Sequence, residues 1–411
     1  MKIRLALVAG SPVYYQAPLY RRLADDPRID FTAIFASTAG ALRPFDNGYG
    51  MPVEWGVDPL SGYRSVFLKR AARNPSGGSV LDLRDPDVVT QIWRGNYDAL
   101  WLHGYHTVTH VLAAMAQKAR GRPVLYREEQ TLLNQRSPWK TFLKGLGLRR
   151  LFQGSYGLFI GTENQRWFQR WGLDPNRLFW TPYAVDNDAL RAEAGLLASR
   201  RDEVRAEFGL PSDRPVVLMV GRLIEKKQPL RVLEAYASIR RKRRCALLVV
   251  GTGPFEADMR RVVREEVIPD VAFAGFLDRT RIGRAYAAAD VFTLFSSHDE
   301  TWGLVVNEAL NFGLPVVVSD RVGSATDLVV DGGNGFTVPH DDVAALAGAL
   351  ERLVCSEALR ADFGVAALEI SSKYTYDRAA EGVIAAVAAA VGPQRWAASG
   401  PQIVAALRGS S

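Results

Sequence analysis

The stretch ADVFTLFSSHDETWGLVVNEALNFGLPVVVSD, residues 289–320, decides the fold of this 411-residue chain. Its two apolar runs, 291–295 and 314–320, are apolar on both faces, which is typical of buried parallel strands. Between them the chain turns at Trp302 and Gly303, and we expect a helix to begin at Leu304. Two parallel strands need a crossover connection of this kind, so the stretch predicts a strand, helix, strand unit.

The same alternation recurs along the whole chain. Short apolar runs, each followed by a helix-compatible stretch, are IRLALVAG, DFTAIFAS, DALWLHG, RPVLYRE, YGLFIGT and RLFWTP in the first half, and RPVVLMVG, CALLVVGTG and VAFAGF in the second. The fold class that this predicts is α/β, with two Rossmann-like doubly wound domains facing a cleft.

The domain boundaries follow from composition. Residues 1–190 form the predicted N-terminal domain, and turn residues at 182–188 provide the hinge. Residues 200–371 form the predicted C-terminal domain. We expect the apolar helix 372–392 to cross back and complete the first domain, with packing on the second as the alternative, and 393–411 to form a tail.

Composition and charge limit the class of protein. Hydrophobic residues make up 48% and charged residues 23% of the chain, as in globular proteins. The two cysteines, Cys245 and Cys355, have no metal-binding or disulfide-framework spacing, which favours a reducing, cytoplasmic location. Residues 1–200 hold 26 Lys and Arg against 17 Asp and Glu, and the remainder 25 against 27. This asymmetry indicates either an anionic partner for the first half or an Arg-rich surface.

Two acids flank the predicted helix start in the opening stretch. Glu300 lies in the loop before Gly303, and Glu308 lies one turn into the helix. The N–H groups of Gly303, Leu304 and Val305 have no acceptor inside the helix and suit an anion. Phosphates at the helix end and a carboxylate for each sugar ring would suit a sugar nucleotide, whereas a solvated helix face is the simpler alternative.

Basic residues follow the first strand of the second half. Gly221 and Arg222 come directly after that strand, and Lys227 follows five residues later. Ligands bind at this edge of parallel sheets, and Arg with Lys can hold a departing diphosphate. Further candidates for the donor site are Gly253 in VGTGP, and Phe276 with Leu277 in the loop at the end of FAGF. Each also has a structural interpretation, as a solvated loop or as core.

Five segments, in this order and spacing, resemble the retaining glycosyltransferases of family 4, group 1, with the glycosyltransferase B architecture. They are GRLIEKK, VGTGP, FAGF, YAAADVFTLFSSHDETWGLVVNEALNFGLPVVVSD and GSATDLVVDGGNGFTVP, and they cover about residues 215–340. The resemblance implies that Arg222 and Lys227 contact the donor diphosphate, that Glu308 binds the ribose and that Glu300 lies near the transferred sugar. Backbone amides of Gly303 to Val305 would contact phosphate or sugar. Residues 200–371 would then be the nucleotide-sugar-binding domain, and residues 1–190 the acceptor-side domain.

The first half departs from the family. Where the family often has Gly-Gly after strand one, this chain has Gly10 followed by Ser-Pro, and Gln16 is a candidate to replace a backbone contact. The family's strand-end histidine matches His103 best, with His106 and His110 as rivals. Polar residues 127–129 end another strand, and Arg127 and Glu128 are candidates either for acceptor binding or for a structural ion pair.

The segment RSPWKTFLKGLGLRRLF, residues 136–152, has five basic residues, no acid and interleaved apolar ones. Such a helix can lie at an anionic membrane surface or pack on its own domain, and Gly145 and Gly147 weaken it as a continuous helix. The Asp-x-Asp pattern of DPD at 85–87 does not end an apolar strand, so we predict a loop or helix start there and no metal.

The predicted activity is metal-independent, retaining transfer of a sugar from a nucleotide-diphosphate sugar to a hydroxyl of a glycan or lipid-linked glycan precursor. No cofactor and no nucleic-acid partner are expected, and the location would be cytoplasmic, with possible peripheral contact at the inner membrane face. The alternatives are transfer to a soluble small molecule or natural product, and a nucleotide-sugar epimerase or hydrolase on the same fold.

Overall fold

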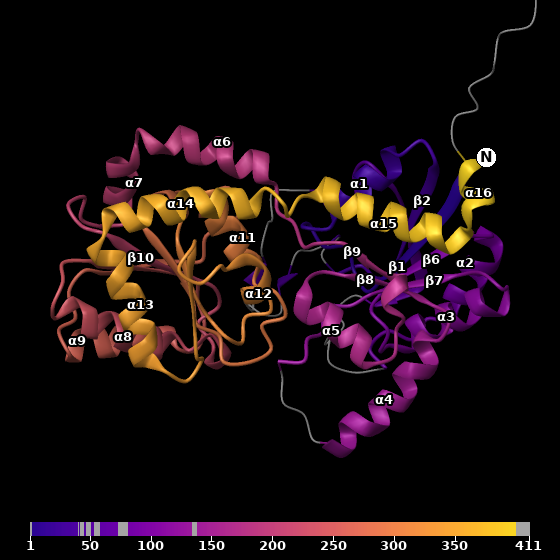
Figure 1. Cartoon of the computed structure of the whole chain (residues 1–411), viewed down its shortest axis with the longest axis horizontal. Helices are drawn as coiled ribbons and strands as arrows, with labels where there is room; N and C mark the ends of the chain where they lie inside the picture. The colour runs from indigo at the N-terminus through magenta and orange to yellow at the C-terminus, as the bar shows by residue number, and fades with distance from the viewer. Residues whose placement is uncertain are drawn as a thin grey trace, which may run out of the picture.

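The protein consists of two α/β domains side by side along its long axis, as the computed structural model shows (Figure 1). The structure describes residues 2–39, 41, 45–46, 51–52, 58–72, 81–133 and 138–399. Each domain is built on one parallel sheet, and the predicted fold class is confirmed. The helix predicted from Leu304 is α11 (Leu304–Asn311). As expected, it connects two parallel strands that are neighbours in one sheet.

The N-terminal sheet has seven parallel strands in the order β5-β2-β1-β6-β7-β8-β9. The chain builds outward from β1 to β2 and β5, then returns to β6 and continues in the other direction. The strands are β1 (Ile3–Ala9), β2 (Ile29–Ser37), β5 (Arg64–Ala72), β6 (Ala99–His103), β7 (Val124–Arg127), β8 (Tyr156–Phe159) and β9 (Leu178–Trp180), and a separate antiparallel pair is β3 (Phe45–Asp46) with β4 (Met51–Pro52).

The C-terminal sheet has six parallel strands in the order β12-β11-β10-β13-β14-β15. Strands β11 and β12 are added on one side of β10, and β13 to β15 on the other, so the strand order reverses between β10 and β13. The strands are β10 (Val216–Val220), β11 (Ala246–Val250), β12 (Val271–Gly275), β13 (Val291–Leu294), β14 (Val316–Ser319) and β15 (Gly335–Val338).

Helices cover both faces of each sheet. On the N-terminal side they are α1 (Ala17–Asp25), α2 (Asp87–Gly95), α3 (Val108–Ala119), α4 (Pro138–Phe152), α5 (Thr162–Arg170), α15 (Tyr376–Val391) and α16 (Pro393–Ala397), with the 3-10 turn η1 (Pro175–Arg177). On the C-terminal side they are α6 (Asn187–Ala198), α7 (Arg201–Glu207), α8 (Pro229–Arg240), α9 (Glu256–Glu265), α10 (Ile282–Ala288), α11, α12 (Ala325–Leu328), α13 (Val343–Cys355) and α14 (Glu357–Ser371), with η2 (Glu225–Lys227).

Burial on both faces explains the continuous apolar strands. In β1, Leu5 and Leu7 pack in a core with α1 and α15, whereas Ala6 and Val8 pack in a second core with α2 and α3. The C-terminal sheet likewise separates two cores. Alternate residues of each strand therefore enter different cores, which is why the strands show no polar alternation.

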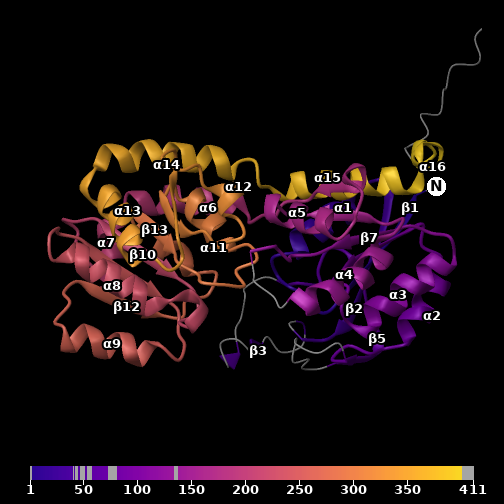
Figure 2. The ribbon, with the colours of Figure 1, turned by 60° about the horizontal axis from the view of Figure 1, so that its bottom comes forward.

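The end of the chain returns to the first domain. After α14 on the C-terminal domain, α15 packs against α1, β8 and β9, and Figure 2 shows it lying along the N-terminal domain. The contact requires Gly382, because a Cβ there would lie 1.9 Å from the Trp180 carbonyl oxygen. In the other direction, α6 packs against α10 and α11, so the chain crosses between domains just before Asn187.

Three features differ from the sequence expectations. The edge strands β5 and β15 were not among the predicted strands, because β5 carries basic residues and β15 is short and begins with Gly335. Helix α4 is continuous through Gly145 and Gly147, which were expected to weaken it. Gly145 has a packing role, because a Cβ there would lie 2.6 Å from the Trp171 ring.

Both cysteines are free, with Cys245 buried and Cys355 exposed. The DPD segment begins helix α2 at Asp87, as predicted. In the described residues no group of His, Cys, Asp and Glu has an arrangement able to hold a metal ion. No helix in the same part of the chain is long and apolar enough to cross a membrane.

Candidate functional site

The C-terminal candidate residues gather where the strand order reverses. Arg222 follows β10, and the loop that carries Glu300 follows β13, the neighbouring strand in the sheet. Ligands of open α/β sheets bind outside the carboxyl ends of the strands at such a reversal. The topology therefore brings together two motifs that are more than 70 residues apart in the sequence.

Lys227 and Glu300 form an ion pair at this point. The Lys227 ammonium donates a short hydrogen bond to Oε2 of Glu300, and Ser296 Oγ donates to the same oxygen at 3.0 Å. Lys227 is buried, with 9% of its surface exposed. The Nζ of Lys226 lies 3.8 Å from Glu300 Oε2 and donates to the Asp299 carbonyl oxygen. The ammonium groups of Lys227 and Lys226 thus both lie close to the Glu300 carboxylate.

This environment shifts both pKa values. Burial lowers the pKa of Lys227, and the opposing effect of Glu300 does not fully offset it. Burial works to raise the pKa of Glu300, but the charges of Lys227 and Lys226 outweigh it and the pKa lies below its ordinary value. Glu300 is therefore held as a carboxylate, and a bound anion near Lys227 would favour the charged ammonium.

Arg222 is half-buried beside this pair and acts on it electrostatically. Within the described residues its guanidinium has no hydrogen bond or ion pair. A guanidinium presents five N–H donors in a fork that matches phosphate oxygens. Arg222 thus keeps all of these donors for a ligand.

The loop before α11 is fixed by its neighbours. The Glu300 carbonyl oxygen accepts from the Gly323 N–H at 2.8 Å, and the Trp302 carbonyl oxygen accepts from the Ser324 N–H at 3.2 Å. Gly303 has a φ of 90° and leads into the helix. A Cβ there would also lie 2.9 Å from Leu294, so glycine is required. The first N–H groups of α11 are held at the sheet edge without an acceptor inside the helix.

Glu308 has a different environment from Glu300. The Tyr286 hydroxyl donates to its Oε2 at 2.7 Å. Burial raises the pKa of Glu308, while this hydrogen bond and the charge of Arg279 work in the opposite direction. The two carboxylates of the opening stretch are thus held separately, one by lysines and one by a phenol. Tyr286 was not predicted as a site residue, because its distance from Glu308 along the chain gives no sign that the two side chains are in contact.

The remaining C-terminal candidates lie in adjacent loops. Gly221 and Gly253 have φ values of 147° and 156°, and a Cβ at Gly253 would lie 2.5 Å from the Leu223 carbonyl oxygen. The Gly253 loop therefore packs directly on the loop after Arg222. Phe276 is half-buried after β12, whereas the Leu277 side chain belongs to the core. Only the backbone of Leu277 is left to contact a ligand.

His103 ends β6, and its Nε2 lies 3.2 Å from Oε1 of Glu129. Glu129 was noted in the polar cluster but was not chosen as a site residue. The feature of the sequence that could have indicated Glu129 as a site residue was its position next to Glu128. Of the rival histidines, His110 is buried at the start of α3 with Nδ1 2.6 Å from Thr107 Oγ1, and burial lowers its pKa to about 3. His106 is exposed.

Arg127 and Glu128 are both buried at the end of β7. Within the described residues, Nε and Nη1 of Arg127 and Oε1 of Glu128 have no hydrogen-bond partner. Burial, then repulsion from Glu129, raises the pKa of Glu128 to about 8. Gly10 follows β1 near Leu83, and Gln16 is buried at the start of α1 without capping it by its side chain.

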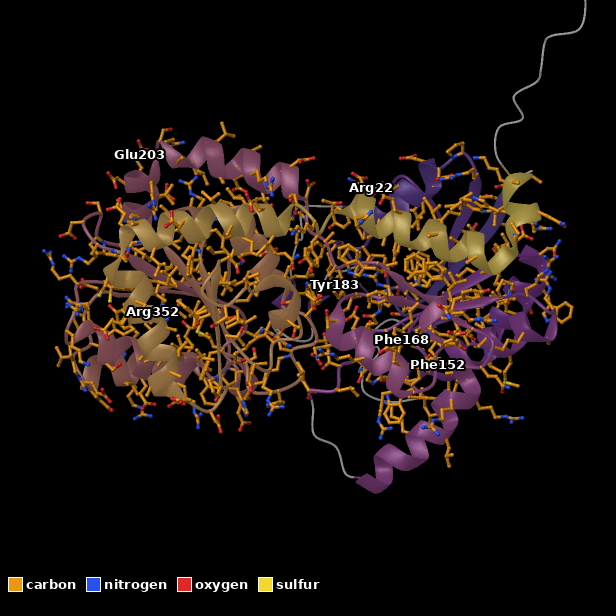
Figure 3. All side chains as sticks on the ribbon, viewed as in Figure 1. Arg22, Phe152, Phe168, Tyr183, Glu203 and Arg352 are labelled. Carbon is orange, nitrogen blue, oxygen red and sulfur yellow. The ribbon has the colours of Figure 1, made fainter. Side chains whose placement is uncertain are left out.

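The carboxyl edges of the two sheets meet through specific contacts. Asp327 of α12 accepts hydrogen bonds from the N–H of Thr162 at 3.0 Å and from its hydroxyl at 2.9 Å, so one domain caps helix α5 of the other. Tyr183 lies where the domains meet (Figure 3), and its ring is 6.1 Å from that of Trp302. Arg321 donates to the Leu133 carbonyl oxygen at 2.6 Å. The loops that carry both candidate sites are thus tied together.

The basic segment 136–152 falls only partly within the described residues. Residues 136 and 137, and the side chains of 138–143, lie outside them. In the rest of α4, Leu148 and Phe152 are buried, Leu146 is exposed and the Lys144 ammonium lies over Tyr105 and Trp167. This half packs on its own domain, and membrane contact remains a prediction.

Comparison with known proteins identifies the family. Residues 200–369 match the family model described as "Glycosyl transferases group 1". D-inositol 3-phosphate glycosyltransferase 2 of Catenulispora acidiphila is 32% identical over 402 residues, which is 90% of this chain and 88% of the relative. The D-inositol 3-phosphate glycosyltransferase of Acidothermus cellulolyticus is also 32% identical, over 58% of this chain and 54% of its own length.

The fold comparison agrees. The structure of HepE from Anabaena, solved in complex with UDP, aligns with a TM-score of 0.67 at 21% identity, covering 93% of this chain and 98% of HepE. The predicted resemblance and the two Rossmann-like domains are confirmed. The chain belongs to the group 1 family of glycosyltransferases, with the glycosyltransferase B architecture.

Proposed function

We propose that the protein is a retaining, family 4 glycosyltransferase that moves a sugar from a nucleotide-diphosphate sugar to a hydroxyl acceptor. The observation that carries the proposal is the Lys227–Glu300 pair beside Arg222, whose guanidinium has no partner in the described part of the chain, at the strand-order reversal of the C-terminal sheet. The donor diphosphate would lie between Arg222, Lys227 and the start of α11. Glu300 would bind the transferred sugar and Glu308 the ribose.

In the proposed step, the acceptor oxygen forms a bond to the anomeric carbon on the face that the diphosphate leaves. The bond between that carbon and the phosphate oxygen breaks, and its electron pair stays with the diphosphate. A diphosphate oxygen takes the acceptor proton. Arg222, Lys227 and the α11 N–H groups stabilise the growing negative charge, because they are already oriented toward it. We propose that this set of charges acts without a metal ion.

The acceptor would bind at the carboxyl edge of the N-terminal sheet, near Gly10, His103 and Arg127. A glycan or lipid-linked glycan precursor is our first candidate, and a soluble small molecule is the alternative. The two relatives are named for D-inositol 3-phosphate, which makes a cyclitol phosphate a useful acceptor to test. We propose a cytoplasmic location with peripheral membrane contact through residues 136–152, since this segment has five basic residues and no acid.

A panel of UDP-, GDP-, ADP- and TDP-sugars, first scored by thermal shift, tests the donor. We expect one nucleotide to stabilise the protein most, with UDP the first candidate because HepE was solved with it. Product analysis with candidate acceptors should then give a new glycoside with the donor's anomeric configuration. Conversion of the donor at the same rate with and without any acceptor would instead support an epimerase or hydrolase.

A further inference from the structure

Arg127 is a buried cation that forms no ion pair within the described residues. It ends β7, and 1% of its surface is exposed. Its Nε and Nη1 have no hydrogen-bond partner in the described residues, and no ion pair to it is found there. Burying a charge is unfavourable unless the charge is paired and hydrogen-bonded. Among the described residues the chain thus leaves this charge without a protein partner.

The surroundings of Arg127 supply only part of what a buried cation needs. Its guanidinium carbon lies 5.2 Å from the centre of the Tyr183 ring, a cation–π contact. Glu129 acts on it electrostatically, followed by Tyr20 and Tyr15. The Glu129 carboxylate, however, contacts His103 through its Oε1. In the described residues Arg127 therefore has a ring contact and the charge of Glu129 nearby, but no carboxylate within ion-pair distance.

The position of Arg127 is that of a ligand-binding residue. It is paired in register with His103 on β6, and β6 is next to β1, where the strand order of the N-terminal sheet reverses. Ligands bind at such reversals. Tyr183, under the guanidinium, also contacts Trp302, the residue before Gly303. The Tyr183 ring thus contacts both Arg127 and Trp302, and Trp302 belongs to the loop proposed to hold the donor phosphates.

We propose that Arg127 binds an anionic group, such as a phosphate, on the acceptor. The acceptor is then a phosphorylated or otherwise anionic hydroxyl compound, and its anion completes the ion pair that the protein leaves open. The planar fork of Arg suits two oxygens of one phosphate. This inference rests on the proposed glycosyltransferase function and adds the chemical class of the acceptor.

The competing interpretation makes Arg127 a brace between the N-terminal sheet and the hinge residue Tyr183. A brace needs the stacked guanidinium but no anion. The two interpretations differ in one property, because only the first predicts an anion site that remains open when the donor site is filled.

Isothermal titration calorimetry with inorganic phosphate, at constant ionic strength, tests this difference. The full-length protein is first saturated with the nucleoside diphosphate that stabilises it most, which fills the donor phosphate site. We expect phosphate to bind to this complex. The affinity should fall at least about tenfold in Arg127→Met. It should stay unchanged in Arg166→Met, a control for an exposed arginine of the same domain paired with Glu163.

Folding of the variants is checked by their nucleoside diphosphate binding. If Arg127→Met does not fold, Arg127→Gln replaces it with the same expectation, because it keeps donors and loses the charge. Three results would overturn the proposal: no phosphate binding to the wild-type complex, unchanged phosphate affinity in the Arg127 variant, or displacement of phosphate by excess nucleoside diphosphate. If no nucleoside diphosphate binds the wild-type protein at all, the proposed function fails instead.

Discussion

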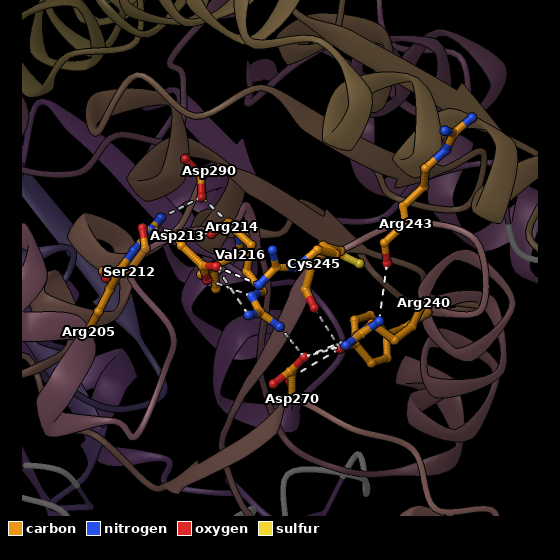
Figure 4. A network of polar contacts seen from close by, with 12 residues as sticks. Arg205, Ser212, Asp213, Arg214, Val216, Arg240, Arg243, Cys245, Asp270 and Asp290 are labelled. Atoms are coloured by element: carbon orange, nitrogen blue, oxygen red, sulfur yellow. Dashed lines mark hydrogen bonds and ion pairs between the residues drawn. The ribbon is translucent and has the colours of Figure 1, made fainter.

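The C-terminal sheet has an amino edge, where its strands begin, and a carboxyl edge, where they end. These two edges hold their buried cations in different ways. At the amino edge, Arg205 donates to Asp290 at 2.6 Å and to three backbone carbonyl oxygens, those of Ala288, Ser212 and Arg214. Figure 4 shows this network, in which Asp270 also accepts from Arg214 and Arg240. Each of these three guanidiniums has a carboxylate acceptor inside the protein.

The carboxyl edge is incomplete in comparison. Lys227 is buried to a similar degree as Arg205, yet within the described residues its ammonium donates only to Glu300. Arg222 has no such partner there. The amino edge has the arrangement expected of charges that stabilise the fold, whereas the carboxyl edge keeps donors for a ligand. The following variants test whether stability and activity divide between the edges in this way.

Replacement of Lys227 should have the largest effect. We expect Lys227→Met to lower turnover by about 10²- to 10³-fold, as loss of one preorganised donor to a developing charge does. Steady-state kinetics with the identified donor and acceptor provide the measurement. Turnover within about threefold of the wild type would remove Lys227 from the catalytic set.

Replacement of Arg205 should act on stability instead. Arg205→Met leaves Asp290 with Arg201 and the Val216 N–H as its partners, and it removes the bonds to three carbonyl oxygens. We expect a loss of about 3 kcal/mol in the free energy of unfolding. Urea unfolding measures this loss, while turnover per folded molecule should stay near the wild-type value. A stable but inactive variant would contradict the division between the edges.

Glu128 gives the N-terminal domain a pH dependence. Its folded pKa of about 8 lies above the ordinary value near 4.5, so the folded state keeps a proton that the unfolded state releases between these pH values. Stability should therefore fall as pH rises from about 4.5 to 8, by on the order of 2 kcal/mol or more.

The matching variant is Glu128→Gln, which has no carboxyl group to titrate at this position. Its free energy of unfolding should therefore lose this part of the dependence on pH. Urea unfolding at pH 5 and at pH 8.5 provides the comparison. Glu381→Gln, at an exposed acid of α15, should keep the wild-type slope. An unchanged slope in Glu128→Gln would show that Glu128 titrates normally.

Asp327 should give the smallest effect. Asp327→Ala removes the cap of α5 across the domain contact, and such caps contribute about 1 kcal/mol. Asp342→Ala removes the cap of α13 inside one domain and is the matched control. We expect both variants to lose similar stability, but only Asp327→Ala to increase the radius of gyration in small-angle scattering. An equal radius of gyration in both variants would show that Asp327 does not help to hold the two domains together.

The sequence predicted the architecture well because the central strands are buried on both faces and carry a strong apolar signal. It missed β5 and β15, since edge strands are shorter or more polar. It also placed the C-terminal candidates in loops that the sheet topology brings together. What it did not indicate were contacts between distant segments, such as Tyr286 with Glu308, Glu129 with His103 and Asp327 with Thr162. Such contacts depend on how domains and loops pack, which spacing along the chain does not encode.

The most direct test of the central claim compares two arginines at opposite edges of the C-terminal sheet. Calorimetry would measure the affinity of the preferred nucleoside diphosphate for the wild type, Arg222→Ala and Arg240→Ala. We predict at least about tenfold weaker binding for Arg222→Ala, or about 1.4 kcal/mol, with unchanged thermal stability of the unliganded chain. Arg240→Ala should bind normally and unfold at lower temperature. Normal binding by Arg222→Ala would contradict the account.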